Sequence, residues 1–123
     1  MRATVFTSYF LFIPLVTSLY FGIYIHALLI GLSMISSLRY HTSFEKTWAR
    51  ADSIFASLVF IYNLYLCFLF RTKLLFIIPV GVVTLASFFF FYLEKHNYNR
   101  YHSVWHLLVI TGTWLCALGF GLL

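Results

Sequence analysis

The chain carries no charged residue over the 36 positions from 3 to 38. A single helix of that length would measure about 54 Å, whereas the hydrocarbon core of a bilayer is about 30 Å thick. One span therefore does not need the whole run, and residues 18–39 are sufficient for it. Pro14 could kink or break the chain before this span. Residues 1–16 are left open as a helix extension, a short separate span or an interfacial piece.

The composition indicates an all-α integral membrane protein. Hydrophobic residues make up 63% of the chain and charged residues 9%, whereas soluble domains are about half apolar and a quarter charged. The basic residues lie in or next to loops, where they suit lipid headgroups, and they form no stripe that would bind nucleic acid. Membrane lipids are therefore the expected partners. Cys67 and Cys116 lie inside apolar runs and form neither a disulfide framework nor a metal-binding CxxC motif.

Two polar segments, residues 40–50 and 94–100, are expected to be loops between the spans. The predicted fold is a single transmembrane domain, residues 1–123, formed by a bundle of four helices, or five if the first 16 residues span separately. The predicted spans are residues 5–39, 51–70, 73–93 and 101–122.

This order of spans places three polar regions at one membrane face: the loop 40–50, the start of the second span and the start of the last. Five basic residues belong to that face and two to the turn on the opposite side, namely Arg39, Lys46, Arg50, Lys95 and Arg100 against Arg71 and Lys73. The positive-inside rule then puts the polar face in the cytosol. Arg2 would add a third charge to the opposite side in a four-span arrangement.

Ligand-type residues gather at this face. His102 and His106 lie four residues apart, so on a helix they project from the same side. Ser37 and His41 share that spacing at the end of the first span, and Asp52 follows at the start of the second. An unpaired imidazole in hydrocarbon costs several kcal/mol, so each histidine needs a partner.

Three imidazoles are a common catalytic set for Zn²⁺, leaving a fourth position for water. Asp52 could orient that water, accept its proton or hold a ligand histidine, and Ser37 could hold the water or donate to an oxyanion. Each residue also has an ordinary explanation: the histidines as interfacial polar groups, Ser37 bonded to its own helix, and Asp52 as a helix N-terminal charge. The metal site is favoured over these explanations because three separate chain segments bring such residues to one face.

Other polar residues serve as controls. His26 lies 15 residues before His41, about 22 Å along a helix, and is too far to share the metal. His96 lies in a loop, where solvation accounts for it. Asn63 in the second span is predicted to make an interhelical hydrogen bond.

The motif Ser37-x3-His41, with Asp52 eleven residues later and His102-Ser-Val-Trp-His106 near the end, resembles the signature of the CREST superfamily. That superfamily includes alkaline ceramidases, progestin and adiponectin receptors, and myomaker-like membrane proteins, and the HSxWH form is most similar to the ceramidase and myomaker-like branches. The resemblance implies that His41, His102 and His106 bind zinc and that Asp52 and Ser37 complete a catalytic site. The known enzymes of the family hydrolyse lipid amide or ester bonds.

The chain departs from this family in size, because family members typically have seven spans. About two helices that would wall a pocket for lipid tails are missing. The chain is then a minimal member, a protein that closes its pocket as a homo-oligomer, or an incomplete gene product.

The preferred hypothesis is a zinc-dependent membrane hydrolase that cleaves a lipid amide or ester bond near the headgroup boundary. The alternative is a non-enzymatic receptor-like or myomaker-like membrane protein in which the metal only ties helices together. A third alternative is an accessory membrane subunit without a metal.

Overall fold

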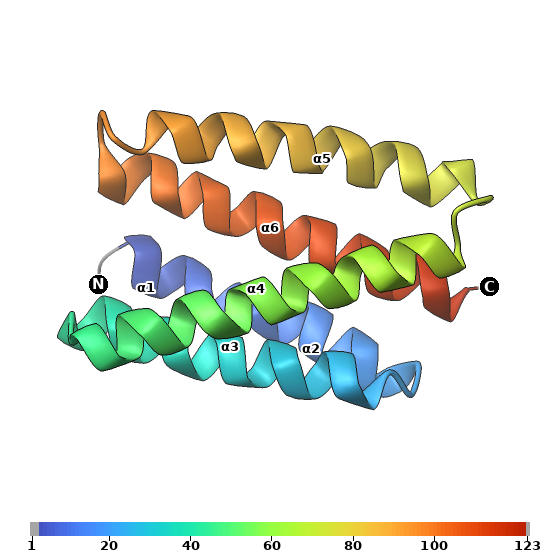
Figure 1. The fold of residues 1–123 in the computed structure, drawn as a ribbon, viewed down its shortest axis with the longest axis horizontal. Helices are drawn as coiled ribbons and strands as arrows, with labels where there is room; N and C mark the ends of the chain where they lie inside the picture. Colours follow the sequence, from blue (N-terminus) through green and yellow to red (C-terminus); the bar gives the residue numbers. More distant parts are fainter. Residues whose placement is uncertain (1–2, 123) are drawn as a thin grey trace.

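The computed structural model describes residues 3–122, which fold into a bundle of long helices that run alternately up and down (Figure 1). The predicted all-α class is confirmed. The elements are α1 (Ala3–Ser8), the 3-10 turn η1 (Tyr9–Leu11), α2 (Phe12–Tyr20), α3 (Tyr24–Ser43), α4 (Lys46–Leu69), α5 (Leu74–Leu93) and α6 (Tyr98–Gly121).

The uncharged N-terminal run is a hairpin of two helical rods, so the prediction of one continuous span over residues 5–39 is wrong. The chain reverses between α2 and α3 at Gly22, whose φ of +74° lies in the left-handed region that L side chains rarely adopt. The break therefore falls at glycine, eight residues after Pro14. Of the alternatives left open for the first 16 residues, the structure places those from Ala3 onward in a separate helical rod that packs against α3.

Pro14 has a smaller local effect. It lies in the first turn of α2, and the turn before it tightens into the 3-10 segment η1. Proline has no N–H to donate to the carbonyl of the residue four positions earlier, which explains why the α-helical bonding is interrupted there.

The predicted loop over residues 40–50 is also wrong. Helix α3 continues to Ser43 and α4 begins at Lys46, so only Phe44 and Glu45 connect them. The segment contains no proline or glycine that would stop either helix. Phe44 makes the reversal with a left-handed backbone, φ 58°. The remaining predicted spans agree with α4, α5 and α6 to within five residues at each end.

Four helical segments are long and apolar enough to cross a membrane: Ala3–Tyr20, Lys46–Leu69, Leu74–Leu93 and Tyr98–Gly121. Helix α3 has a similar length of 20 residues but is more polar, because it carries His26, Arg39 and His41. It packs against α2 and α4, and His26 and His41 are buried there, whereas Arg39 is exposed.

The helix order collects five helix ends at one side of the bundle. The start of α1, the end of α3 with the start of α4, and the end of α5 with the start of α6 all lie there (Figure 1). Within residues 3–122, α5 has an extensive interface only with α6, so α4 and α5 do not pack against each other along their length. Both features determine what surrounds the histidines.

Candidate metal centre

Three buried histidines from two helices meet at this side of the bundle. His41 belongs to the last turn of α3, and His102 and His106 belong to the first three turns of α6. Each offers a ring nitrogen, and these three nitrogens lie within 4.8 Å of one another. Nitrogens bound to one tetrahedral Zn²⁺ lie roughly 3.3 Å apart, so each pair must close by at most about 1.5 Å. The cluster can therefore hold a metal ion.

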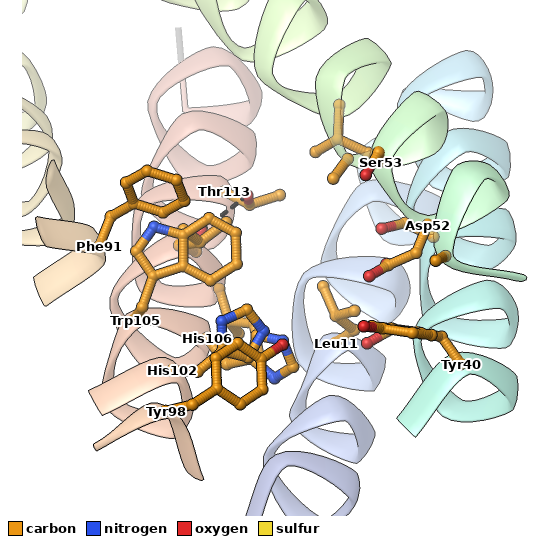
Figure 2. A pocket seen from close by; sticks show the side chains of 17 residues that line it. Leu11, Tyr40, Asp52, Ser53, Phe91, Tyr98, His102, Trp105, His106 and Thr113 are labelled. Atoms are coloured by element: carbon orange, nitrogen blue, oxygen red, sulfur yellow. Dashed lines mark hydrogen bonds between the residues drawn. The ribbon is translucent and has the colours of Figure 1, made fainter. Parts of the chain in front are cut away.

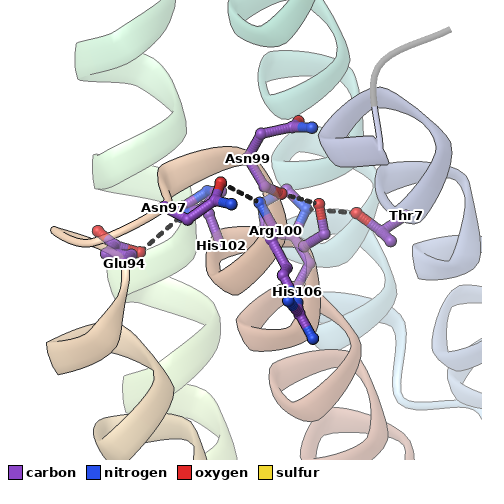
Figure 3. A network of polar contacts seen from close by, with 8 residues as sticks. Thr7, Glu94, Asn97, Asn99, Arg100, His102 and His106 are labelled. Carbon is purple, nitrogen blue, oxygen red and sulfur yellow. Dashed lines mark hydrogen bonds and ion pairs between the residues drawn. The ribbon is translucent and has the colours of Figure 1, made fainter.

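The His102 ring is fixed on three sides. It stacks between Tyr98 and Trp105 of its own helix, at centroid distances of 4.5 and 5.0 Å. Its Nδ1 lies 2.8 Å from a carboxylate oxygen of Glu94, the residue that follows α5 (Figure 3). A carboxylate accepts the Nδ1 proton, which leaves the Nε2 lone pair for a metal.

The His106 ring is oriented by α1. Its Nδ1 lies 3.0 Å from the hydroxyl oxygen of Thr7, and that hydroxyl donates its only proton to the carbonyl of Thr4. The hydroxyl therefore accepts the proton of Nδ1, and the Nε2 lone pair of His106 is also left for a metal. His102 and His106 thus share one tautomer, although their partners come from opposite ends of the chain.

His102 and His106 form one wall of a cavity of about 290 Å³ (Figure 2). Asp52 projects from α4 on the opposite wall, together with Tyr40 from α3. Among residues 3–122, the group of converging metal-ligand atoms contains the three histidines and no fourth residue. Asp52 therefore faces the histidines across the cavity and does not supply a fourth ligand. A structural zinc site would require four protein ligands.

Ser37 lines the same cavity, but its hydroxyl is engaged. Its oxygen lies 2.8 Å from that of Ser8, and Ser8 donates its own proton to the carbonyl of Thr4. Ser37 must then donate its proton to Ser8, so the lone pairs of the Ser37 oxygen are what remain for other hydrogen bonds. In this arrangement Ser37 can accept a hydrogen bond from a water molecule but cannot at the same time donate one to an oxyanion.

His26 is separate from the metal cluster, as predicted. Its two ring nitrogens lie 2.8 Å from the Ser18 hydroxyl and 2.7 Å from the side-chain oxygen of Asn63. The amide of Asn63 also donates to Thr113 over 3.1 Å, so the predicted interhelical hydrogen bonding of Asn63 is confirmed.

The hydrogen-bond partners of the histidines are not predicted from the sequence. Glu94 is one of only three acidic residues in the chain and directly precedes the turn before His102, which could have marked it. Thr4, Thr7 and Ser8 repeat at helical spacings of three and four, a pattern that places their hydroxyls on one face. Nothing in the sequence indicates which helix that face meets.

Searches of protein-family models, of curated proteins and of solved structures found no match to this chain. The class that fold and site define is a helical protein with four membrane-spanning-type helices and a buried three-histidine cluster able to hold a metal.

Proposed function

We propose that this chain is a zinc-dependent membrane hydrolase that cleaves a lipid amide or ester bond. The observation that carries the proposal is the pairing of three converging imidazoles with a carboxylate on the facing wall of one cavity. Three imidazoles with an open fourth position are typical of catalytic zinc, whereas closed four-ligand sets are typical of structural zinc.

The residues of the cavity divide the chemistry between them. His41, His102 and His106 would hold the ion. Glu94 orients the ring of His102, and Thr7 orients the ring of His106. Bound zinc supplies a Lewis acid that polarises a carbonyl and lowers the pKa of water. Asp52 faces the cluster and would accept the proton of the attacking water.

A lipid substrate fits the surroundings of the cavity. A second, mainly apolar cavity of about 560 Å³ lies between α4 and α5. It shares Ser53, Phe91 and Trp105 with the histidine cavity, so the two cavities are neighbours. Its exposed wall residues Phe60, Ile61 and Phe88 would face lipid tails. An acyl chain could therefore lie between α4 and α5 while the carbonyl of the same lipid reaches the histidines at the end of the bundle.

The resemblance to the CREST superfamily supports the same proposal. The residues of its motif, Ser37, His41, Asp52, His102 and His106, surround or line a single site. The helices that this chain lacks relative to the family would lie between the aspartate helix α4 and the histidine helix α6 in the sequence. In this chain residues 70–73 connect α4 to α5 directly, and the groove between these two helices would face the bilayer.

We further propose that the histidine side of the bundle faces the cytosol. Arg39, Lys46, Arg50, Lys95 and Arg100 belong to helix ends and turns on that side, whereas Arg71 and Lys73 belong to the opposite turn. This asymmetry satisfies the positive-inside rule. Arg2, which entered the sequence-based count, lies outside the described residues.

The first experiment measures bound metal by plasma mass spectrometry on detergent-purified protein, for the parent and for the double variant His102→Ala/His106→Ala. We expect about one zinc per protomer in the parent and almost none in the variant. Both proteins are then incubated with ceramides, lysolipids and phospholipids, and only the parent should release fatty acid.

Two results would contradict the proposal. A folded parent without metal removes the mechanism, and turnover that survives the loss of metal does the same. Full zinc occupancy without hydrolysis of any of these lipids would favour the non-enzymatic alternative, in which the ion ties α3 to α6.

A further inference from the structure

The two cysteines of the chain meet in the fold. Cys67 belongs to α4 and Cys116 to α6, 49 residues apart, yet their sulfur atoms lie 3.5 Å from each other. They are the only cysteines in 123 residues. A disulfide has a sulfur–sulfur distance of about 2.05 Å, so the two atoms need to approach by about 1.5 Å to form one.

The pair is reachable from the lipid phase. Cys116 is buried in the apolar cluster with Leu66 and Phe70, whereas Cys67 is only partly buried. Both sulfurs border a small cavity of about 80 Å³ between α4, α5 and α6. Phe60 and Leu64 on its rim are 46% and 55% exposed on the outside of the bundle. A lipid chain beside α4 therefore comes close to Cys67.

We propose that Cys67 and Cys116 are a modification site, oxidised to an intramolecular disulfide by lipid peroxyl radicals of the surrounding membrane. The usual route to a disulfide requires a thiolate, and a charged sulfur is costly in hydrocarbon. Transfer of a hydrogen atom creates no charge and avoids that cost. The apolar surroundings of the pair thus favour a radical oxidant that is itself dissolved in lipid.

The reaction balances with two radicals. Each peroxyl radical takes one hydrogen atom from one thiol and becomes a lipid hydroperoxide. The two S–H bonds break, and the two sulfur radicals pair to form the S–S bond. Two thiols and two peroxyl radicals therefore yield one disulfide and two hydroperoxides, with no proton or electron left over.

The bond would tie together the two helices that form opposite walls of the histidine cavity. Helix α4 carries Asp52, and α6 carries His102 and His106. A covalent link between these helices limits how far the carboxylate can move from the imidazoles. The proposal concerns the cysteines alone and does not depend on bound metal or on hydrolysis.

The test uses the full chain in vesicles of polyunsaturated phosphatidylcholine with a lipid-soluble azo initiator, and in vesicles of saturated phosphatidylcholine with the same initiator. The protein is then cleaved after lysine and arginine residues, without prior reduction of disulfides. The expected product, far more abundant in polyunsaturated vesicles because lipid oxidation there multiplies the peroxyl radicals, is a linked pair of peptides 51–71 and 101–123 that has lost two hydrogen atoms, recovered from the monomer band. Reduction should separate the pair.

The variants Cys67→Ser and Cys116→Ser provide matched controls, and each should give no linked peptide. The parent alone keeps the test decisive if a variant fails to fold. Two free thiols in the parent after the lipids have oxidised would overturn the proposal. Oxidation to sulfinic or sulfonic acid, or links between chains in place of the internal bond, would overturn it equally.

Discussion

Helix α3 carries two buried histidines that the protein treats in opposite ways. His26, near its start, is fully buried and has hydrogen-bond partners from α2 and α4 at both ring nitrogens. His41, near its end, lies with its ring centroid 5.2 Å from that of His102 and 5.1 Å from that of His106. The first histidine belongs to a chain of polar side chains, and the second belongs to a cluster of like rings.

The two histidine environments differ in the ring nitrogens that they leave available to a metal. Because the Asn63 amide donates to Thr113, its oxygen must accept from His26, and the other nitrogen of His26 then accepts from Ser18. Every hydrogen-bonding site of that ring is used inside the protein. Within residues 3–122, the side-chain hydrogen bonds of His102 and His106 to Glu94 and Thr7 are made through Nδ1. Burial alone therefore does not mark a ligand, whereas lone pairs that converge on one point do.

The largest expected effect separates His41→Ala from His26→Ala. His41→Ala removes one of three ligands, so bound zinc should fall from about one per protomer to almost none. His26→Ala should keep its zinc but lose about 2 kcal/mol of unfolding free energy, because Ser18 and Asn63 lose their buried partner. Metal analysis and denaturation in mixed micelles measure the two quantities. A folded His26→Ala protein without zinc would break the comparison.

Asp52→Asn should separate turnover from metal binding. The amide keeps the shape of the side chain but cannot accept a proton, so lipid hydrolysis should fall by about 10²–10⁴ while zinc content stays unchanged. The control is Glu45→Gln, which removes another carboxylate from an exposed position in the α3–α4 connection. Loss of zinc in Asp52→Asn would instead identify Asp52 as a ligand.

Glu94→Gln should give the smallest of the three effects. Glutamine still reaches His102 but orients and polarises the ring less than a carboxylate does, so zinc affinity should fall by roughly 10- to 100-fold. Competition with a chelator of known affinity measures this change, again beside Glu45→Gln. Equal affinity in both variants would show that the contact between Glu94 and His102 does not support the metal site.

Local spacing made much of the site predictable. His102 and His106 are four residues apart, and this separation puts them on one face of any helix that contains both. The alternation of apolar runs with polar segments predicted that His41 would reach the same side of the bundle. The roles of Asp52 and Ser37 stay predictions, with Ser37 restricted by its bond to Ser8.

The sequence failed where the outcome depends on which surfaces meet. The N-terminal run has no charge to mark its end, so the reversal at Gly22 was not located. Without that reversal α1 would not reach α6, and the contact of Thr7 with His106 could not be foreseen. The polarity of residues 40–50 predicts a loop, whereas α3 extends to Ser43 and α4 begins at Lys46, because polar residues at a membrane surface are compatible with a helix.

By itself the sequence determined the all-α class, the presence of helices long and apolar enough to span a membrane, and the helix that carries each candidate ligand, because hydropathy and the 3.6-residue period act along the chain. Only the tertiary structure decided the tautomers of His102 and His106, the separation of Asp52 from the ligand set, the open groove beside α5 and the meeting of Cys67 with Cys116. Each of these depends on packing between helices that are distant in sequence, and helical periodicity defines the faces of a helix without specifying their neighbours.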